Sequence, residues 1–467
     1  MGEITLERLK QRLSKMFDVQ YRELCCRLGT VYMIHVHSMC DLKDVSDFVV
    51  RPLSLYSGRV YGLHMSTSGV LQTGMIKDIT ELEDAVSAIL SGNILILLPE
   101  LDQVVCCDMR GYKTRNVEVT QSETVIKGPR EGFTEDLRTN LSEVRRRVKT
   151  PDLKMERFFL GQQSQTETVL IYLSECAPEK LVNFVRDKIQ GIQKQYVFYN
   201  NYLEDEIRNK FTPFDTVGYT EKPDVAVSKL AEGRVVVITD GIPIAVTAPM
   251  FFIENFQTTD DYTLNPIMAN LGRGFRWIAF FLSTLAPGLY LALITYHFKL
   301  VPTVFLYRLA LFRAGVPVPT VIELLYMMIF FQIIREAGVR LPQPIGPTLS
   351  IVGALILGES AVASGLASQF TVVVVAITSI GSYLVPMLQG ASFFFSMLIL
   401  FMSAMLGLPG FYMGFCVFAA HLAGLTSCGY PYLYPFGTEK TFRFNDVFWR
   451  GDLNKKAKQP LSRNEAP

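Results

Sequence analysis

Long segments without charged residues in the second half of this 467-residue chain limit what it can fold into. Residues Trp277–Phe298 include no Lys, Arg, Asp or Glu, and at ~1.5 Å per residue a helix of that length spans the ~30 Å hydrocarbon core of a bilayer. We therefore predict an all-α polytopic membrane domain over residues 277–437, with four to six crossings. Further apolar segments follow at Pro319–Ile334, Ile345–Leu357, Gly365–Leu388 and Ala391–Leu425, the last of which is expected to break at Gly407–Gly410.

The distribution of charge agrees with this division. Residues 277–437 carry five Lys or Arg and three acidic residues, whereas residues 438–467 carry seven basic and four acidic residues. By the positive-inside rule, this basic tail is expected in the cytoplasm. The first 276 residues begin without the apolar core of a signal peptide, so we expect them there too. The formal net charge of +1 gives no basic footprint for nucleic acid.

The first 276 residues show a mixed α/β pattern that occurs twice. Each copy is expected to contain a strand, a helix and a β-hairpin: Thr30–Val36, Asp41–Val50 and Ile94–Leu98 with Val104–Cys107, then Thr168–Leu173, Pro178–Ile189 and Val235–Ile238 with Ile242–Val246. The dipeptide Asp240-Gly241 is a strong signal for the turn of the second hairpin. We predict an α+β soluble head of two α/β subdomains, residues 1–127 and 151–276, although such common elements also recur by chance.

A charged segment, residues 128–150, connects the two copies. It opens with Gly128, Pro129, Arg130, Glu131, Gly132 and Phe133. A helix is expected to follow over Thr134–Lys149, with Thr134 as its N-cap and basic residues near its end, where cations complement the helix dipole. Such a helix is usually a solvated connector; the alternative is a strut between subdomains or subunits.

Charged residues are expensive inside a membrane, at roughly 2.5–3.5 kcal/mol near its centre, and those present usually face protein or water. Glu323 interrupts the second apolar segment and is a functional candidate for this reason. Arg335, Glu336 and Arg340 follow near the end of that segment and are candidates for juxtamembrane coupling. Glu336 and Arg340 are spaced as a stabilising helix pair, so Arg335 is expected to point elsewhere, to lipid phosphate or to the head.

Glu359 is the second acidic candidate, in a segment dominated by small residues. On a helix, Leu355, Glu359, Val362 and Leu366 fall on one stripe. Several copies arranged in a ring would place one carboxylate per subunit beside hydrophobic constrictions, which is a known plan for a cation-selective pore. The alternative is a tight helix contact in which Glu359 hydrogen-bonds a neighbour.

Motifs for catalysis, cofactors and metals are not found. The sequence contains no phosphate-binding GxxxxGK[ST] loop, HExxH or GxSxG motif, and its eight cysteines show no CxxC spacing. We therefore expect that the protein is not an enzyme and that it binds no cofactor and no metal. The hypothesis that the protein is a secondary transporter is disfavoured, because residues 277–437 show no inverted-repeat pattern.

Six stretches resemble, in the same order, motifs of the GerA family, which comprises the A subunits of bacterial spore germinant receptors. The first resembles the family signature GPREGFxExLRTN and includes Arg138. The stretches are Gly128–Asn140, Tyr219–Asp224, Glu232–Pro243, Ile334–Pro342, Ser350–Gly358 and Gly429–Leu433.

This resemblance implies a multi-pass protein of the spore inner membrane whose head and tail face the spore core. It implies assembly with a permease-like B subunit, which binds the nutrient, and with a lipoprotein C subunit. It also implies a pentameric homo-oligomer that forms a nutrient-gated channel for monovalent cations. The family often has Gln where this chain has Glu359, which leaves selectivity open. Two alternatives remain: a non-conducting signalling scaffold, and a SpoVAF-type amplifying channel, whose branch shares these motifs.

Overall fold

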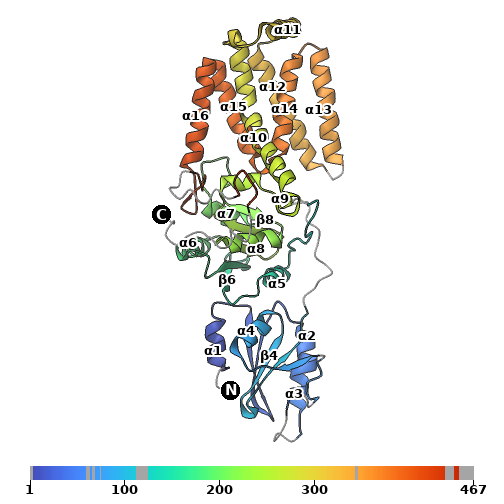
Figure 1. Ribbon diagram of the computed structural model, residues 1–467, viewed down its shortest axis with the longest axis vertical. Coiled ribbons are helices and arrows are strands. Elements are labelled where there is room, and N and C mark those ends of the chain that lie inside the picture. The colour runs from blue at the N-terminus through green and yellow to red at the C-terminus, as the bar shows by residue number, and fades with distance from the viewer. Residues whose placement is uncertain are drawn as a thin grey trace.

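The computed structural model describes residues 4–58, 64–65, 69–73, 75–111, 125–341, 345–436 and 446–451. The molecule is elongated, with two mixed α/β units stacked at its N-terminal end and a bundle of long helices at the other end (Figure 1). Of the predicted basic tail, only residues 446–451 are among those described.

An antiparallel five-stranded sheet with the order β1-β2-β4-β5-β3 forms the first unit. Its strands are β1 (Val19–Cys26), β2 (Gly29–Val36), β3 (Ile76–Asp78), β4 (Ile94–Leu98) and β5 (Gln103–Cys107). Its helices are α1 (Leu6–Arg12), α2 (Leu42–Val45), a π-helical turn (Ser46–Val50), α3 (Arg51–Leu55) and α4 (Leu82–Leu90). β4 is buried throughout, because hydrophobic clusters cover both faces of the sheet.

The second unit is also an antiparallel five-stranded sheet, with the order β6-β7-β9-β10-β8. Its strands are β6 (Leu153–Leu160), β7 (Thr166–Leu173), β8 (Gly218–Thr220), β9 (Val235–Thr239) and β10 (Ala245–Ala248). Its helices are α5 (Leu137–Arg147), α6 (Glu179–Gln190), α7 (Asn201–Ile207) and α8 (Pro223–Ala231).

The two units share one topology. Each runs through a hairpin, a helical segment, a short strand, a helix and a second hairpin, and in each the two hairpins pair through their inner strands. Met33 of β2 lies opposite Ile96 of β4, and Leu170 of β7 lies opposite Val237 of β9. The pattern that occurs twice in the sequence thus corresponds to a fold that occurs twice in the structure.

The sheets also contain features that the sequence pattern did not indicate. The edge strands β1 and β6 were not predicted, because half-exposed edge strands alternate with polar residues and show no apolar run. The last strand begins at Ala245 rather than at Ile242, since Pro243 has no N–H to donate to a ladder. The helix expected over Asp41–Val50 continues through the π-helical turn into α3.

Long helices form the C-terminal region. They are α10 (Pro266–Thr295), α12 (Thr320–Arg340), α13 (Ile345–Ala363), α14 (Gln369–Tyr383), α15 (Gln389–Leu406) and α16 (Leu408–Gly424), with the shorter α11 (Thr303–Arg313) at the end far from the sheets (Figure 1). A short helix, α9 (Asp260–Thr263), leads into α10. α10 begins at Pro266, well before Trp277, where the segment without charged residues starts. Its first turns lie beside the second sheet unit (Figure 1). Gly407, with φ of +68°, separates α15 from α16, as the predicted break required.

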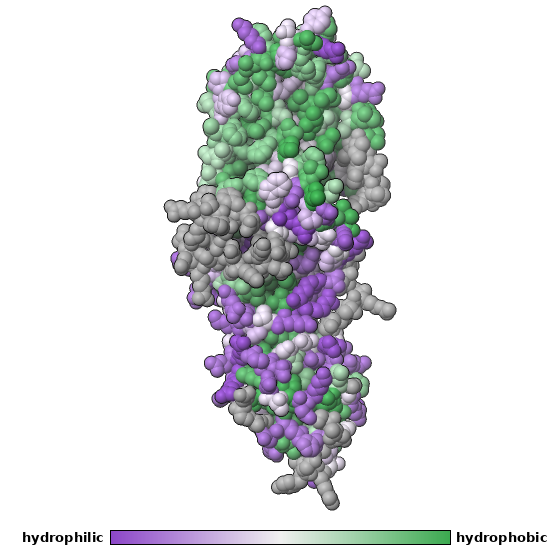
Figure 2. Space-filling view, viewed as in Figure 1, coloured by the Kyte–Doolittle hydropathy of each residue, from purple (hydrophilic) through white to green (hydrophobic). Residues whose placement is uncertain are grey.

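The surface of the helical region differs from that of the sheets. Figure 2 shows a largely apolar helical end and a largely hydrophilic sheet end. Among the described residues, two helical segments are long and apolar enough to cross a membrane, Pro266–Thr295 and Pro386–Leu406. Shorter apolar helices lie at Val352–Ala363, Gln369–Tyr383 and Leu408–Gly424. In contrast to this apolar exterior, hydroxyl side chains such as Ser283, Thr371 and Ser396 are buried between the helices.

Candidate functional site

The predicted pore stripe lies on an open face of α13. Leu355 is 67% exposed, Glu359 is also exposed and Val362 is partly exposed. α13 packs mainly against α12, and Figure 1 shows it at the outer edge of the helical region. Glu359 forms no hydrogen bond or ion pair with any residue that the structure describes. Within one chain, therefore, this face points away from the protein.

Leu366 does not belong to the helical part of the stripe. α13 ends at Ala363, and Gly365, with φ of +69°, follows it. Leu366 lies in the turn before α14, is 51% exposed, and its N–H donates to the Ala361 carbonyl at 2.9 Å. The helical stripe consists of the other three residues, because the left-handed glycine ends the helix before the fourth.

Glu323 is fully buried in the first turn of α12, which begins at the end of the bundle far from the sheets (Figure 1). Its Oε2 accepts hydrogen bonds from Thr371 Oγ1 at 2.5 Å and from Ser368 Oγ at 3.3 Å. Ser368 is also the N-cap of α14, so the carboxylate connects the start of α12 to the start of α14. Glu323 Oε1 has no hydrogen-bond partner among the described residues.

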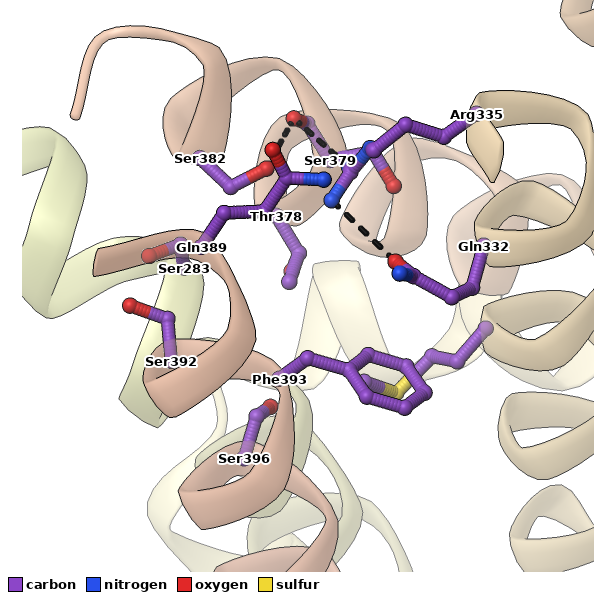
Figure 3. Close-up of a pocket in the computed structure, with 11 residues that line it drawn as sticks. Ser283, Gln332, Arg335, Thr378, Ser379, Ser382, Gln389, Ser392, Phe393 and Ser396 are labelled. Atoms are coloured by element: carbon purple, nitrogen blue, oxygen red, sulfur yellow. Dashed lines mark hydrogen bonds between the residues drawn. The ribbon is translucent and has the colours of Figure 1, made fainter. Parts of the chain in front are cut away.

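Arg335 is 6% exposed and points between α12, α14 and α15, as Figure 3 shows. Its guanidinium donates to Gln332 Oε1 at 3.2 Å and to the Ser379 carbonyl at 3.1 Å, and lies 4.9 Å from the ring centroid of Tyr383. As expected, Arg335 points away from the Glu336–Arg340 pair. It points into a pocket within the helical region and not toward the head.

Glu336 and Arg340 form the predicted helix pair, with Arg340 Nη2 2.6 Å from Glu336 Oε1. Both side chains are largely exposed, at 59% and 76%. An exposed pair of this kind contributes little to stability.

The connector motif begins against α9 and ends in the core of the second sheet. The N–H of Ile126 donates to Asp260 Oδ1 at 3.1 Å, and Gly128 adopts φ of +146° nearby. Pro129 and Arg130 are exposed. The chain then turns inward through the buried Gly132 to Phe133, which is 4% exposed and whose N–H donates to the Glu221 carbonyl at 2.7 Å. The motif therefore connects the start of the helical region to the second sheet unit.

Glu131 of this motif binds the basic end of α5. Its carboxylate accepts hydrogen bonds from Arg146 at 2.8 Å and from Arg147. Although partial burial opposes the effect, the two guanidinium groups hold the pKa of Glu131 below its ordinary value. The motif and the helix that follows it are thus clamped together.

The connector helix differs from the solvated helix expected from its charge. It begins at Leu137 rather than Thr134, because Asp136 caps it by accepting the Thr139 N–H at 3.0 Å. Thr134 instead exchanges hydrogen bonds with the Asn140 side chain, at 2.7 and 2.6 Å. Much of α5 is buried, including Arg145, so it is a packed strut between the two sheet units.

The hairpin turn of the second sheet meets the start of α5. Asp240 Oδ1 accepts the Leu137 N–H at 3.2 Å, and the N–H of Gly241 donates to the Glu135 carbonyl at 2.8 Å. Gly241 has φ of +80°, as the predicted turn requires. Two motifs that lie about a hundred residues apart in the sequence thus form one contact.

The other side of α5 holds the first sheet unit. Arg145 is fully buried and forms an ion pair of 3.0 Å with Asp18, which is 3% exposed. The chain before Asp18 also bonds to β6, with the Met155 N–H donating to the Lys15 carbonyl at 3.2 Å. Arg138 is exposed, and burial together with this nearby cation lowers the pKa of His37.

A buried charge network that the sequence analysis missed joins α9, α10 and the tail. Arg273 forms ion pairs of 3.0 Å with Asp261 and 2.8 Å with Asp446, and Arg276 also binds Asp261. Tyr262 Oη donates to Asp446 at 2.5 Å. Arg273 and Arg276, three residues apart just before the apolar segment, are the sequence signal for this network. Spacing could not pair Arg273 with Asp446, because that acidic residue lies in the tail, far along the chain.

No group of three or more His, Cys, Asp or Glu side chains that could hold a metal ion occurs within the part of the chain that the structure describes.

The sequence model of the family described as "Bacillus/Clostridium GerA spore germination protein" matches residues 7–462. The chain is 32% identical to spore germination protein KA of Bacillus subtilis over 97% of this chain and 85% of that protein. It is 32% identical to spore germination protein GerLA of Bacillus cereus over 92% of this chain and 89% of that protein.

A membrane protein of Bacillus subtilis, YfkQ, is also 32% identical, over 95% of this chain and 88% of that protein. Among solved structures, the N-terminal domain of the A subunit of the Bacillus megaterium spore germinant receptor GerK3 matches with a TM-score of 0.40 and 23% identity, over 53% of this chain and 94% of that one. The chain belongs to the GerA family of spore germination proteins.

Proposed function

We propose that this protein is the A subunit of a spore germinant receptor and that several copies form a nutrient-gated channel for monovalent cations. The family membership supports the receptor subunit. The observation that carries the channel is the open face of α13, on which the charged Glu359 lies among apolar residues.

The surface supports a position in the spore inner membrane. Large apolar side chains such as Phe281, Ile333 and Phe401 are exposed on the helices, whereas hydroxyl groups are buried between them. An apolar exterior of this extent suits lipid and not water. The six long helices then cross in alternating directions, and both the sheet units and the tail lie on the core-facing side.

A ring of subunits explains why α13 is exposed. A carboxylate facing lipid is costly, so Glu359 requires water or a protein partner. If α13 faces a symmetry axis, one carboxylate per subunit lines the path, with Leu355 and Val362 as constrictions next to it. The opposite side of α13 carries Ala361, 4% exposed, which packs on the protein's own core. We propose a pentamer, which the resemblance implies.

Assembly with a permease-like B subunit and a lipoprotein C subunit completes the proposal. Nutrient binding elsewhere must reach the channel through this chain. Residues 126–147, which include the connector motif and α5, are suited to this role, because Ile126 contacts Asp260 of α9 and Arg145 contacts Asp18 of the first sheet unit.

Cation flux from liposomes tests the channel. The full chain is reconstituted with its B and C partners, and the ratio of potassium to chloride flux is measured after nutrient addition. Replacing Glu359→Gln should lower this ratio severalfold, because the ring of negative charge is lost. Glu336→Gln removes an exposed carboxylate of α12 and should leave the ratio unchanged.

The second candidate is a non-conducting subunit that couples a nutrient-binding partner to separate channels, which the strut-like α5 favours. It predicts no nutrient-dependent flux in these liposomes. It also predicts that Glu359→Gln has no effect in spores, while disruption of the Glu131 clamp abolishes signalling.

A further inference from the structure

A polar pocket lies inside the apolar helical region (Figure 3), lined by residues near the ends of α12 and α14 and the start of α15. It is partly open to solvent and is bounded by α10, α12, α14 and α15. The half-buried Gln332, Ser379 and Gln389 let it reach the surface. Six of its eleven lining side chains carry hydroxyl groups.

The charge in this pocket has no acidic partner. Arg335 is 6% exposed, and it forms no ion pair with any described residue. Its partners are neutral: Gln332, the Ser379 carbonyl and, in the amide orientation that satisfies both atoms, Gln389 Oε1 at 3.0 and 3.2 Å. The carbonyl end of α14 supplies only partial negative charge. A buried cation normally requires a full counter-charge.

The pocket also holds an unused hydrogen-bonding group. Ser396 is fully buried, and its Oγ has no partner among the described residues. Ser392, one helical turn before it on α15, is 4% exposed and lines the same space. Because buried hydroxyls are nearly always hydrogen-bonded in native proteins, the Ser396 hydroxyl can donate to an acceptor that the described residues do not supply.

The electrostatics select the kind of ligand. Arg335 is positive, and α15, an 18-residue helix, begins at Gln389 and directs its positive end toward this side. A cation would be repelled, whereas a group with several acceptor oxygens and a negative charge fits both the guanidinium and the hydroxyls. We propose that this pocket binds a phosphate group.

The location indicates the source of that phosphate. The pocket lies where α12 and α14 end and α15 begins, beside the sheet units (Figure 1). On the membrane placement proposed above, on which this step rests, that level corresponds to the headgroups of the core-facing leaflet. The phosphate of an anionic lipid is therefore the ligand, and free inorganic phosphate is the second source of the same chemistry.

Lipid binding to the full chain tests the site. Delipidated protein in detergent is titrated with phosphatidylglycerol, with diacylglycerol, which has the same chains but no phosphate, and with inorganic phosphate. Native mass spectrometry and thermal shift follow binding. We expect one phosphatidylglycerol per chain and no retained diacylglycerol. A thermal shift with inorganic phosphate, and its competition with the lipid, would assign the free anion as the source.

Variants localise the binding. Arg335→Gln should weaken phosphatidylglycerol binding at least about tenfold, since a charge-assisted hydrogen bond is lost. Ser396→Ala removes only a hydroxyl group that has no partner among the described residues, so it should leave folding intact. It should weaken phosphatidylglycerol binding about two- to tenfold. Arg340→Gln removes an exposed arginine of the same helix and should change nothing. The site would be overturned if both variants bound phosphatidylglycerol as tightly as the unchanged protein, or if the protein retained diacylglycerol as well as phosphatidylglycerol.

Nutrient-dependent cation flux is measured separately, after the same variants are reconstituted into liposomes with the B and C partners. Normal flux in a protein that binds phosphatidylglycerol no better than diacylglycerol would reject the phosphate site and leave the channel proposal standing. Binding that depends on Arg335 in a protein that shows no flux would reject the channel and retain the pocket.

Discussion

Buried charged side chains in the sheet units behave according to their immediate neighbours. Arg145 and Asp18 are both buried, but each satisfies the other, so the pair holds the first sheet unit against α5. Glu143, two residues earlier on the same helix, is 3% exposed, and neither of its carboxylate oxygens has a hydrogen-bond partner among the described residues. Burial accordingly raises its pKa to about 7.

Glu143 should make stability depend on pH. The folded-state pKa of about 7 lies above the ordinary value of 4.5, so the folded protein retains a proton that the unfolded chain has lost. Stability is therefore highest below about pH 4.5 with respect to this group, and falls as the pH rises through 7. Replacing Glu143→Gln should stabilise the protein at pH 8 by on the order of 1–3 kcal/mol, and much less at pH 5.

Thermal unfolding of the full chain at the two pH values measures this difference. Glu135→Gln, at an exposed position just before α5, is the matched control and should show no pH-dependent gain. An equal effect of Glu143→Gln at pH 5 and pH 8 would contradict the prediction.

At the level of elements, apolar runs and turn signals located the long C-terminal helices, α6 and the inner strands, because burial of apolar side chains determines them, but they did not locate α4, α8 or α11. They could not locate edge strands such as β1, nor the true start of α5, where the Asp136 carboxylate competes with Thr134 for the capping position. They also could not pair Glu323 with Thr371, which lies 48 residues away on another helix. Contacts of this kind depend on how the helices pack and not on any local pattern.

The contact between α15 and α16 depends on a glycine. A Cβ at Gly410 would lie 2.0 Å from the Met402 carbonyl oxygen, so the two backbones could not remain in place. Gly410→Ala should destabilise the helical region by about 1–3 kcal/mol. At Gly390, on α15, a Cβ would meet nothing within 4 Å, and Gly390→Ala should be neutral or stabilising by up to ~1 kcal/mol.

Thermal denaturation of the purified protein in detergent compares the two variants. If both alanines lowered the midpoint equally, the close approach at Gly410 would not be what holds α16 against α15.

At the scale of the whole molecule, the chain joins a duplicated sheet fold to a helical region through several contacts, two of which involve α9. One is made just before the connector motif, where the N–H of Ile126 donates to Asp260. The other is the buried network in which Arg273 binds both Asp261 and Asp446. The duplication was predictable because the same order of elements recurs along the chain. The network was not, since it unites residues separated by 173 positions. The two connections give the sheets a rigid attachment to α10.

The central claim is that the α13 face lines a water-filled path in the assembled protein, and modification of an introduced thiol tests it most directly. Val362→Cys is reconstituted with the B and C partners, and nutrient-dependent potassium flux is measured before and after a charged, membrane-impermeant thiol reagent. The unmodified chain, whose native Cys416 is exposed on α16, is the control. The reagent should abolish flux in Val362→Cys and leave the control unchanged. Full modification of the introduced thiol with undiminished flux would contradict it.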